Sequence, residues 1–271
     1  MTDERRIIFL DIDGTLSWDG AAPCEADIAA LRRARSAGHT VLINTGRSYG
    51  VLPQTFMGVD YLDGYLCGCG TTLILKDKVV FDSALDRELL RDVSAFFLNQ
   101  PGRCCLFEAW HNAYLIQCDT HFNPWPSAPL VHRADDFDTV YADAHITKLT
   151  VYGNITPAEY DLYHGRLVPV VQSSGQWYEA ILPGNGKGMG IRRACKALGI
   201  PVENSIAVGD SDNDLDMFAA AGVAVAMEEA SASAMAAARY RTGRCGHGGV
   251  ARAVETLVFG EGTLDLIRNR A

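Results

Sequence analysis

The sequence predicts an α/β protein whose parallel sheet is interrupted by an inserted α+β segment. Apolar runs alternate with amphipathic helical segments over residues 1–80, and this alternation resumes at residue 184. Such alternation is typical of a parallel sheet flanked by helices. Residues 81–183 contain mainly short strand-like runs instead. Polar motifs follow several of the apolar runs, at the strand ends where open α/β sheets bind ligands.

The first part of the core reads as strand, helix and strand. Residues 5–10 are rich in Ile, Phe and Leu and form the first expected strand. Residues 25–37 have helical periodicity, and Gly38 ends the helix. Residues 41–44 form the next apolar run. We therefore expect these elements to be the beginning of the parallel sheet.

The insertion is expected to mix one sheet with helices. Residues 85–98 look helical, and a helix carrying Tyr160 is expected later in the segment. Strands are expected at residues 104–108, 113–118, 145–152, 168–173 and 177–182, the last two joined as a hairpin through residues 174–176. Residues 121–132 hold three of the ten prolines and form either a rigid loop over a ligand or ordinary loop packing.

The last part of the chain returns to the core pattern. It is expected to contain a helix at 188–198, a strand at 205–208, a helix at 213–221 and a strand at 223–227. Residues 1–80 and 184–271 are therefore predicted to form one discontinuous domain, with residues 81–183 as a second domain.

The most informative motif is the pair of acids that ends the first strand. Asp11 and Asp13 are two residues apart, so they leave an extended chain on the same face. This places a nucleophilic carboxylate beside an acid/base carboxylate where a metal can join them. Gly14 then allows a turn whose backbone amides can face a phosphate. The alternative is a surface turn with two solvated acids.

A second acidic cluster follows the strand expected at 205–208. Residues 209–217 read GDSDNDLDM, and their carboxylates repel one another unless a cation is present. Oxygen ligands of this kind suit Mg²⁺. Acids also favour the first turn of a helix, which is the alternative role for Asp212 and Asp216. Asp210 directly follows the strand and its glycine, so it is the better candidate ligand.

Two shorter segments offer groups for an anion. Thr45, Gly46 and Arg47 follow the strand at 41–44, where a hydroxyl and a backbone amide can hold phosphate oxygens. Lys187 lies in the glycine-rich turn of residues 184–188, before an amphipathic helix. Its ammonium can neutralise phosphate charge, although an exposed lysine is the ordinary role of this residue type.

In this order, the motifs resemble those of the haloacid dehalogenase (HAD) superfamily, and specifically its Cof-type phosphatases with a C2-type (IIB) cap. The matching segments are FLDIDGTL at 9–16, NTGR at 44–47, Lys187 and GDSDNDLDM at 209–217, and the GGVA of residues 248–251 resembles the family's terminal segment. The resemblance implies a Rossmann-like parallel-sheet HAD core carrying the inserted α+β domain as a cap that selects substrate.

The resemblance also implies a Mg²⁺-dependent phosphatase that hydrolyses a small-molecule phosphate monoester, such as a sugar phosphate. Asp11 would form an aspartyl phosphate and Asp13 would act as general acid and base. The implied metal ligands are the carboxylates of Asp11 and Asp210, the backbone carbonyl of Asp13, and Asp214 through water. The implied phosphate-binding residues are Thr45, Gly46, Arg47, Lys187 and Asn213.

Three positions depart from the usual family pattern. Cys69-Gly70 replaces a common Asn-Gly, and Glu228-Glu229 replaces a Gly-Asn pair. The two glutamates disfavour a bisphosphate or a strongly acidic leaving group. The third departure is at residues 242–247, which replace a typically acidic or amide-rich loop. Arg244 in this loop either offsets the two glutamates or is merely solvated.

Two other functions remain open at this point. A phosphomutase would use the same aspartyl phosphate but return the phosphoryl group to the sugar. A noncatalytic phosphate-binding module would keep the fold alone, and the presence of both Asp11 and Asp13 argues against it.

Composition narrows the expected partners. The 271-residue chain has a net charge of −9 and no run of Lys or Arg, which disfavours nucleic acid and anionic membranes as partners. No targeting segment is evident, and no apolar run reaches the length of a membrane span. The eight cysteines lack zinc-site spacing and are expected to be reduced thiols. A cytoplasmic monomer or weak homodimer is therefore expected.

Overall fold

A computed structural model describes residues 4–116, 127–171 and 175–267 of the chain. The residues form two compact units, which we describe separately. Unit 1 contains the described residues up to Gly46, Leu52–Val80 and those from Gly186 on, and unit 2 contains Arg47–Val51 and Phe81–Asn185. The division differs from the predicted domains mainly at residues 47–51, which the sequence analysis placed in the core.

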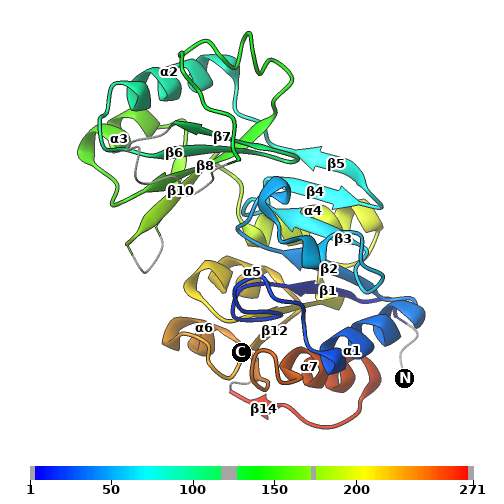
Figure 1. Cartoon of the computed structure of the whole chain (residues 1–271). Helices are drawn as coiled ribbons and strands as arrows, with labels where there is room; N and C mark the ends of the chain where they lie inside the picture. The colour runs from blue at the N-terminus through cyan, green and yellow to red at the C-terminus, as the bar shows by residue number, and fades with distance from the viewer. Residues whose placement is uncertain (1–3, 117–126, 172–174, 268–271) are drawn as a thin grey trace. The chain divides into compact units, whose positions relative to one another are not determined.

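Unit 1 is built on a mostly parallel sheet, as its alternating pattern predicts (Figure 1). The strand order of the nine-stranded sheet is β14-β13-β12-β11-β1-β2-β3-β4-β5. Strands β13 to β3 in this order run parallel, and β14 and β4 pair antiparallel with their neighbours. The bounds are β1 Ile7–Leu10, β2 Thr40–Asn44, β3 Gly64–Cys67, β4 Thr72–Leu75, β5 Lys78–Asp82, β11 Ser205–Gly209, β12 Val223–Ala226, β13 Tyr240–Arg241 and β14 Asp265–Leu266.

Helices cover this sheet in two groups. Helix α1 packs on α7, whereas α4 packs on α5 and α5 on α6 (Figure 1). The α-helices of unit 1 are α1 Glu25–Ser36, α4 Lys187–Leu198, α5 Leu215–Ala220, α6 Ala232–Ala237 and α7 Gly249–Phe259. Short 3₁₀ turns are η2 Gln54–Phe56, η3 Val202–Asn204 and η4 Asp212–Asp214. The predicted helix at 213–221 is thus divided between η4 and α5.

Strand β1 is the centre of the sheet, and its four residues are fully buried. Leu10 is in register with Ile43 of β2 on one side and Val208 of β11 on the other. The residues that follow these three positions therefore emerge together at one edge of the sheet. This register brings segments distant in the sequence to one place.

Unit 2 contains a five-stranded antiparallel sheet in the order β7-β6-β8-β10-β9, as expected for an α+β domain. Apolar side chains of β6, β8 and β10 pack with α2 and α3 in its core. Asp86 caps α2 by accepting from the Leu89 amide. The elements are η1 Tyr49–Val51, α2 Arg87–Leu98, β6 Cys105–Ala109, β7 Ala113–Ile116, β8 Ile146–Tyr152, α3 Pro157–Tyr163, β9 Val168–Val171 and β10 Trp177–Ile181.

Residues 47–51 belong to unit 2 because their side chains pack there. The Ser48 hydroxyl donates to Glu108 Oε2 over 2.6 Å, and both residues are buried. The Tyr49 ring lies 6.2 Å from that of Trp110, and Val51 packs against an apolar cluster around Leu106. No local pattern in the sequence indicates these partners, which are distant in the chain.

Some predicted features fall outside the described residues. Residues 121–126 of the proline-rich segment, the end of the strand predicted at 113–118, and the first residue of the hairpin turn at 174–176 are among them. The antiparallel pairing of β9 with β10 is described and agrees with the predicted hairpin.

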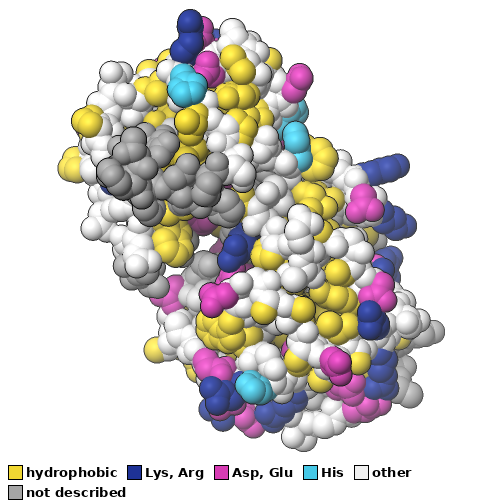
Figure 2. All heavy atoms as spheres, viewed as in Figure 1, with side chains coloured by type: hydrophobic (Ala, Val, Ile, Leu, Met, Phe, Trp, Pro, Cys, Tyr) yellow, Lys and Arg dark blue, Asp and Glu magenta, His cyan; other side chains and the backbone are white. Residues whose placement is uncertain are grey.

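The described cysteines agree with the expected thiol chemistry, and the described surface carries charges of both signs. On the face drawn in Figure 2, basic side chains of unit 1 lie beside acidic ones. Ion pairs such as Arg33 with Glu261, at 2.6 Å, are of this kind. The seven cysteines among the described residues are all free thiols. No helix in the described part of the chain combines the length and apolar character needed to cross a bilayer.

Candidate active site

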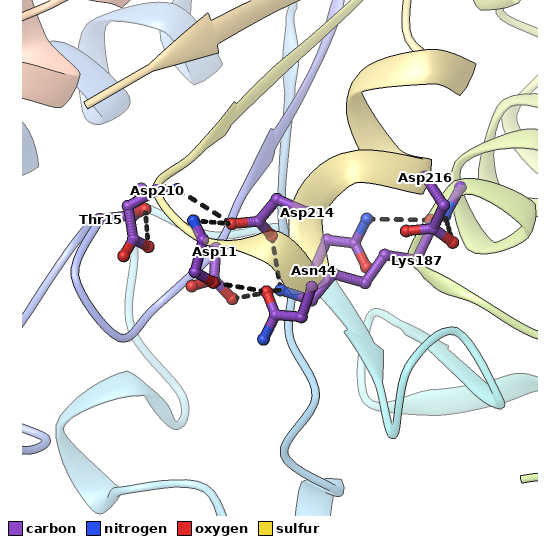
Figure 3. A network of polar contacts seen from close by, with 10 residues as sticks. Asp11, Thr15, Asn44, Lys187, Asp210, Asp214 and Asp216 are labelled. Atoms are coloured by element: carbon purple, nitrogen blue, oxygen red, sulfur yellow. Dashed lines mark hydrogen bonds and ion pairs between the residues drawn. The ribbon is translucent and has the colours of Figure 1, made fainter. Parts of the chain in front are cut away.

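Three carboxylates meet at the edge of the sheet where β1 and β11 end (Figure 3). Asp11 follows β1, Asp210 follows β11, and Asp214 ends the 3₁₀ turn η4. One oxygen from each carboxylate lies within 4.8 Å of the others. Asp11 and Asp214 are buried and Asp210 is half-buried. Three hard oxygen donors in this arrangement can hold a divalent cation.

The ammonium of Lys187 contacts two of the three carboxylates, those of Asp11 and Asp214 (Figure 3). Lys187 is the first residue of α4, one residue earlier than the predicted helix start, and only 1% of its surface is exposed. Its ammonium donates to Asp11 Oδ1 at 2.8 Å, Asp214 Oδ1 at 2.7 Å and Asn213 Oδ1 at 3.0 Å. The lysine is therefore a buried member of the cluster rather than an exposed side chain.

Burial and mutual repulsion perturb the carboxyl groups. Burial raises the pKa of Asp11 to about 8; Lys187 opposes this shift through its charge and its hydrogen bond, and Asp214 and Asp210 add smaller contributions that raise the pKa. Burial and Asp214 raise the pKa of Asp210 to about 6. Burial lowers the pKa of Lys187, but Asp11 and Asp214 more than offset this effect and raise it above its usual value. Lys187 therefore keeps its positive charge, while Asp11 and Asp210 hold their protons to a higher pH than an exposed acid does.

The acids of residues 209–217 have different partners. Asp214 Oδ2 accepts from the amides of Asp210 and Ser211 at 2.9 and 3.1 Å, which holds the turn closed. Asp212 is exposed and accepts from Ser231 and Ser233 at the start of α6. Asp212 does bond to the start of a helix, as predicted. That helix is α6 rather than the helix that follows Asp212 directly in the sequence.

Asp216 lies outside the carboxylate cluster. Its Oδ2 accepts from the amide of Gly188 at 2.9 Å, in the first turn of α4. The predicted helix-end role therefore holds for Asp216 as well, although the helix is α4 and not the α5 that carries it. This cross-helix partner could not be read from local sequence.

The remaining predicted site residues differ in burial and in the unit to which they belong. Asp13 is half-buried and forms an isolated β-bridge with Ser17. Its charge contributes to the raised pKa of Asp210. Thr45 is buried at the end of β2, and its amide donates to Leu66 O at 2.9 Å. Gly46 follows it at the boundary of unit 1. Arg47 belongs to unit 2, so its predicted contact with phosphate stays a prediction.

Two residues of the site were missed by sequence reasoning. Thr15 Oγ1 donates to Asp210 Oδ1 at 3.1 Å, and Asn44 Nδ2 donates to the backbone oxygen of Lys187 at 3.1 Å. Both residues stand inside the motifs already identified, at positions 15 and 44. The position of these residues inside the motifs was the signal available in the sequence. Their partners, Asp210 and Lys187, could not be predicted because they lie far along the chain.

The departures from the family pattern have local structural consequences. Cys69 adopts φ +55°, a left-handed conformation that costs a non-glycine residue about 1–2 kcal/mol. A Cβ at the adjacent Gly70 would meet Gly186 O at 2.1 Å, so this turn packs closely against the start of α4. Arg244 donates to Glu229 Oε1 at 2.6 Å, which resolves the open alternative: it offsets one of the two glutamates.

We expect divalent metal to bind this cluster more tightly as pH rises. Protons held by Asp11, with pKa about 8, and Asp210, with pKa about 6, must leave before the carboxylates can act as ligands. If both protons must leave, the apparent dissociation constant for Mg²⁺ should fall about a hundredfold between pH 6 and pH 8. Calorimetric titration in two buffers of different ionisation enthalpy would measure both this affinity and the protons released. A pH-independent affinity without proton release would contradict the expectation.

Most of the chain matches one protein family, and it is similar to two characterised proteins. Residues 8–254 match the family model described as haloacid dehalogenase-like hydrolase. Phosphoglycolate phosphatase 1 of Saccharolobus solfataricus is 26% identical over 209 residues, covering 76% of this chain and 75% of that protein. The chloroplastic endoribonuclease YBEY of Arabidopsis thaliana is 26% identical over 234 residues, covering 75% of this chain. The chain spans only 38% of that second relative.

Solved structures share the fold along nearly the whole chain. A sugar phosphatase of HAD subclass IIB has a TM-score of 0.75 and 25% identity, covering 94% of this chain and 99% of its own. A protein from Geobacillus kaustophilus HTA426 has a TM-score of 0.79 and 22% identity, covering 93% of this chain and 98% of its own. The second likeness concerns the fold alone.

Proposed function

Because the chain belongs to the haloacid dehalogenase-like hydrolase family, we propose that it is a Mg²⁺-dependent phosphatase acting on a small-molecule phosphate monoester. The observation that carries this proposal is the meeting of Asp11, Asp210 and Asp214 with the buried ammonium of Lys187. The cluster combines a nucleophile, a cation site and a fixed positive charge. The sequence resemblance to the same superfamily rests on these residues independently of their geometry.

In the proposed reaction, a carboxylate oxygen of Asp11 attacks phosphorus, and the bond to the ester oxygen breaks. Asp13 gives its proton to the departing alkoxide and then removes a proton from the water that hydrolyses the aspartyl phosphate. Lys187 remains charged because its pKa is raised, so it can stabilise the transferring phosphoryl oxygens. Asn213 accepts from this ammonium and restricts its direction.

The residues at the cluster fit Mg²⁺. The donors are hard carboxylate oxygens, and burial raises the pKa values of two of them, Asp11 and Asp210, with neighbouring acids adding to the shift. Asp11 and Asp210 would hold the ion directly, with the Asp13 carbonyl beside them and Asp214 through water. When bound, Mg²⁺ supplies charge neutralisation to the phosphoryl oxygens. Thr45 and Gly46, at the end of the neighbouring strand β2, are the proposed anchors for the same oxygens, together with Arg47.

A sugar phosphate is the proposed substrate class. Support comes from the subclass IIB sugar phosphatase, which is similar over 94% of this chain. The alternative is a phosphomutase, since the same acids could return the phosphoryl group to another position of the sugar.

Free thiols in all seven described cysteines fit a reducing compartment, and we propose a cytoplasmic protein. We further propose that it has no nucleic-acid or membrane partners and acts as a monomer or weak homodimer.

Phosphate release from a panel of sugar, polyol, nucleotide and cofactor phosphates tests the proposal. We expect release from at least one ester class with Mg²⁺ and none after EDTA treatment, because charge on the phosphoryl group would then be uncompensated. An isomeric sugar phosphate without free phosphate would favour the mutase. Binding of phosphate with neither product would favour a noncatalytic module.

A further inference from the structure

We propose that Asn44 and Asp216 are positioning residues that hold the peptide group between Lys187 and Gly188, and thereby aim the ammonium of Lys187 at the reacting phosphoryl group. The inference rests on the proposed function for its catalytic consequence. Its structural content concerns unit 1 alone and is independent of which ester is the substrate.

Both polar ends of this single peptide group are engaged by side chains from other elements. Its carbonyl oxygen, on Lys187, accepts from Asn44 Nδ2 at 3.1 Å. Its amide, on Gly188, donates to Asp216 Oδ2 at 2.9 Å. Asn44 ends β2 and Asp216 lies in the first turn of α5, so the peptide is held from two directions (Figure 3). Because the peptide group is planar, hydrogen bonds at both of its ends restrict its rotation, and this restricts the direction in which the Lys187 side chain leaves the backbone.

The Gly188 amide needs an acceptor because it lies in the first turn of a helix. The first four amides of a helix have no partner within it, and a cap side chain usually supplies one. Here the cap residue of α4 is Gly186, which has no side chain to offer. Asp216 supplies the missing acceptor from α5 although much of its own surface is exposed.

The glycines on either side of Lys187 allow this arrangement. A Cβ at Gly186 would lie 2.4 Å from Asp216 Oδ2, and a Cβ at Gly188 would lie 2.3 Å from the backbone oxygen of Asp216. Real Cβ atoms do not approach other atoms so closely, and the second clash is with backbone, which cannot move aside easily. The glycines predicted to form the turn that carries Lys187 therefore also allow α5 to pack against this residue.

The buried side chain of Asn44 has one unpaired polar atom, which is unusual for a residue that only supports the fold. The side chain is fully buried, and its Oδ1 has no hydrogen-bond partner among the described residues. A buried unpaired carbonyl costs free energy. The unpaired Oδ1 therefore cancels part of the stability that the Nδ2 hydrogen bond contributes. Removal of the whole amide should therefore change stability little, while releasing the Lys187 carbonyl.

Orthovanadate affinity in the presence of Mg²⁺ tests the inference, because this anion resembles the transferring phosphoryl group. We expect Asn44→Ala to raise the dissociation constant about tenfold with little change in melting temperature. Asp216→Ala should raise the constant roughly threefold to tenfold, whereas Asp216→Asn, which keeps an acceptor oxygen, should recover most of the affinity. On a substrate found in the panel, the loss should appear in kcat more than in KM.

Asp212→Ala is the matched control, since this acid of the same segment is exposed and bonds only to serines of the α6 start in the contacts described above. Its vanadate affinity should equal that of the wild type. Equal affinities in wild type, Asn44→Ala and Asp216→Ala would overturn the inference. So would failure of Asp216→Asn to bind more tightly than Asp216→Ala.

A second measurement separates the inference from the proposed function. The buried Lys187 ammonium, which donates to three oxygens, should give a slowly exchanging ¹H–¹⁵N resonance, assigned by its loss in Lys187→Met. We expect faster exchange in Asn44→Ala and Asp216→Ala than in wild type. An unchanged exchange rate would refute the positioning role even in an active enzyme. Faster exchange in a protein that releases no phosphate would instead support the role and refute the phosphatase.

Discussion

Replacing Asp11 by Asn is expected to abolish turnover while making the metal-free protein more stable. The amide cannot attack phosphorus, so kcat should fall by at least about 10³-fold, as for loss of other enzymatic nucleophiles. The substitution nearly preserves shape and leaves Lys187 its bond to Asp214 at 2.7 Å. The loss of activity should therefore occur without loss of the fold.

The gain in stability follows from the direction of the Asp11 pKa shift. Its pKa rises from 3.8 to about 8 on folding, so the folded state favours the protonated acid. Such a group loses stability as pH rises from about 4 through 8, the opposite of a salt-bridged acid whose folded pKa is depressed. Asn cannot ionise and escapes this loss. At pH 8 we expect a gain of roughly 1–2 kcal/mol, a fraction of the full shift because Lys187 loses one carboxylate partner.

Denaturant unfolding at pH 5 and pH 8 in EDTA, together with phosphate release in Mg²⁺, would check both halves of this prediction. Asp212→Asn is the matched control, because Asp212 is an exposed acid outside the carboxylate cluster. It should keep wild-type turnover and stability. An Asp11→Asn protein that retains turnover would remove Asp11 as the nucleophile. A variant less stable than wild type at pH 8 would contradict the electrostatic account.

Replacing Lys148 by Met is expected to destabilise unit 2 by about 3–5 kcal/mol, the usual cost of leaving buried charges unpaired. Lys148 is 2% exposed on β8, between Glu108 of β6 and Glu179 of β10. Its ammonium lies 3.0 Å from Glu108 Oε1 and 2.5 Å from Glu179 Oε1. Methionine fills a similar volume but removes the ammonium that bridges the two carboxylates.

The same variant is expected to loosen residues 47–51. Glu108 also accepts from Ser48 and from Thr150, so its orientation depends on the whole network. Without Lys148, repulsion between the two glutamates favours movement of Glu108 away from Ser48. Hydrogen exchange should therefore become faster in 47–51 as well as in β6.

Urea unfolding of Lys148→Met and of a triple variant with Glu108→Gln and Glu179→Gln would isolate the charge effect. The triple variant should recover most of the lost stability, because removing a whole buried ion cluster is often nearly neutral. Lys196→Met, on the exposed surface of α4, should stay within about 0.5 kcal/mol of wild type. Equal destabilisation of the single and triple variants would show that packing, rather than charge, dominates.

Prediction from sequence worked where the signal was periodic and local. Strand β1 differs from its predicted range only at its start, and α1 and α2 lie within one or two residues of theirs. The split of residues 213–221 into η4 and α5 was missed because the Asp214 carboxylate bonds two amides of the turn. Residues 47–51 were misplaced because a buried serine and glutamate 60 residues apart leave no pattern in the sequence.

The sequence by itself determined the fold class, the motif residues and the strand ends from which they emerge, because hydrophobic periodicity and glycine turns act over a few residues. Only the tertiary structure decided which acids lie close enough together to hold a cation and which bond to helix ends. It also decided that Lys187 is buried and that Asn44 and Asp216 hold its backbone. These contacts join β2, α4 and α5, and electrostatics and hydrogen bonding act through space, so their partners follow from strand register and helix packing rather than from spacing along the chain.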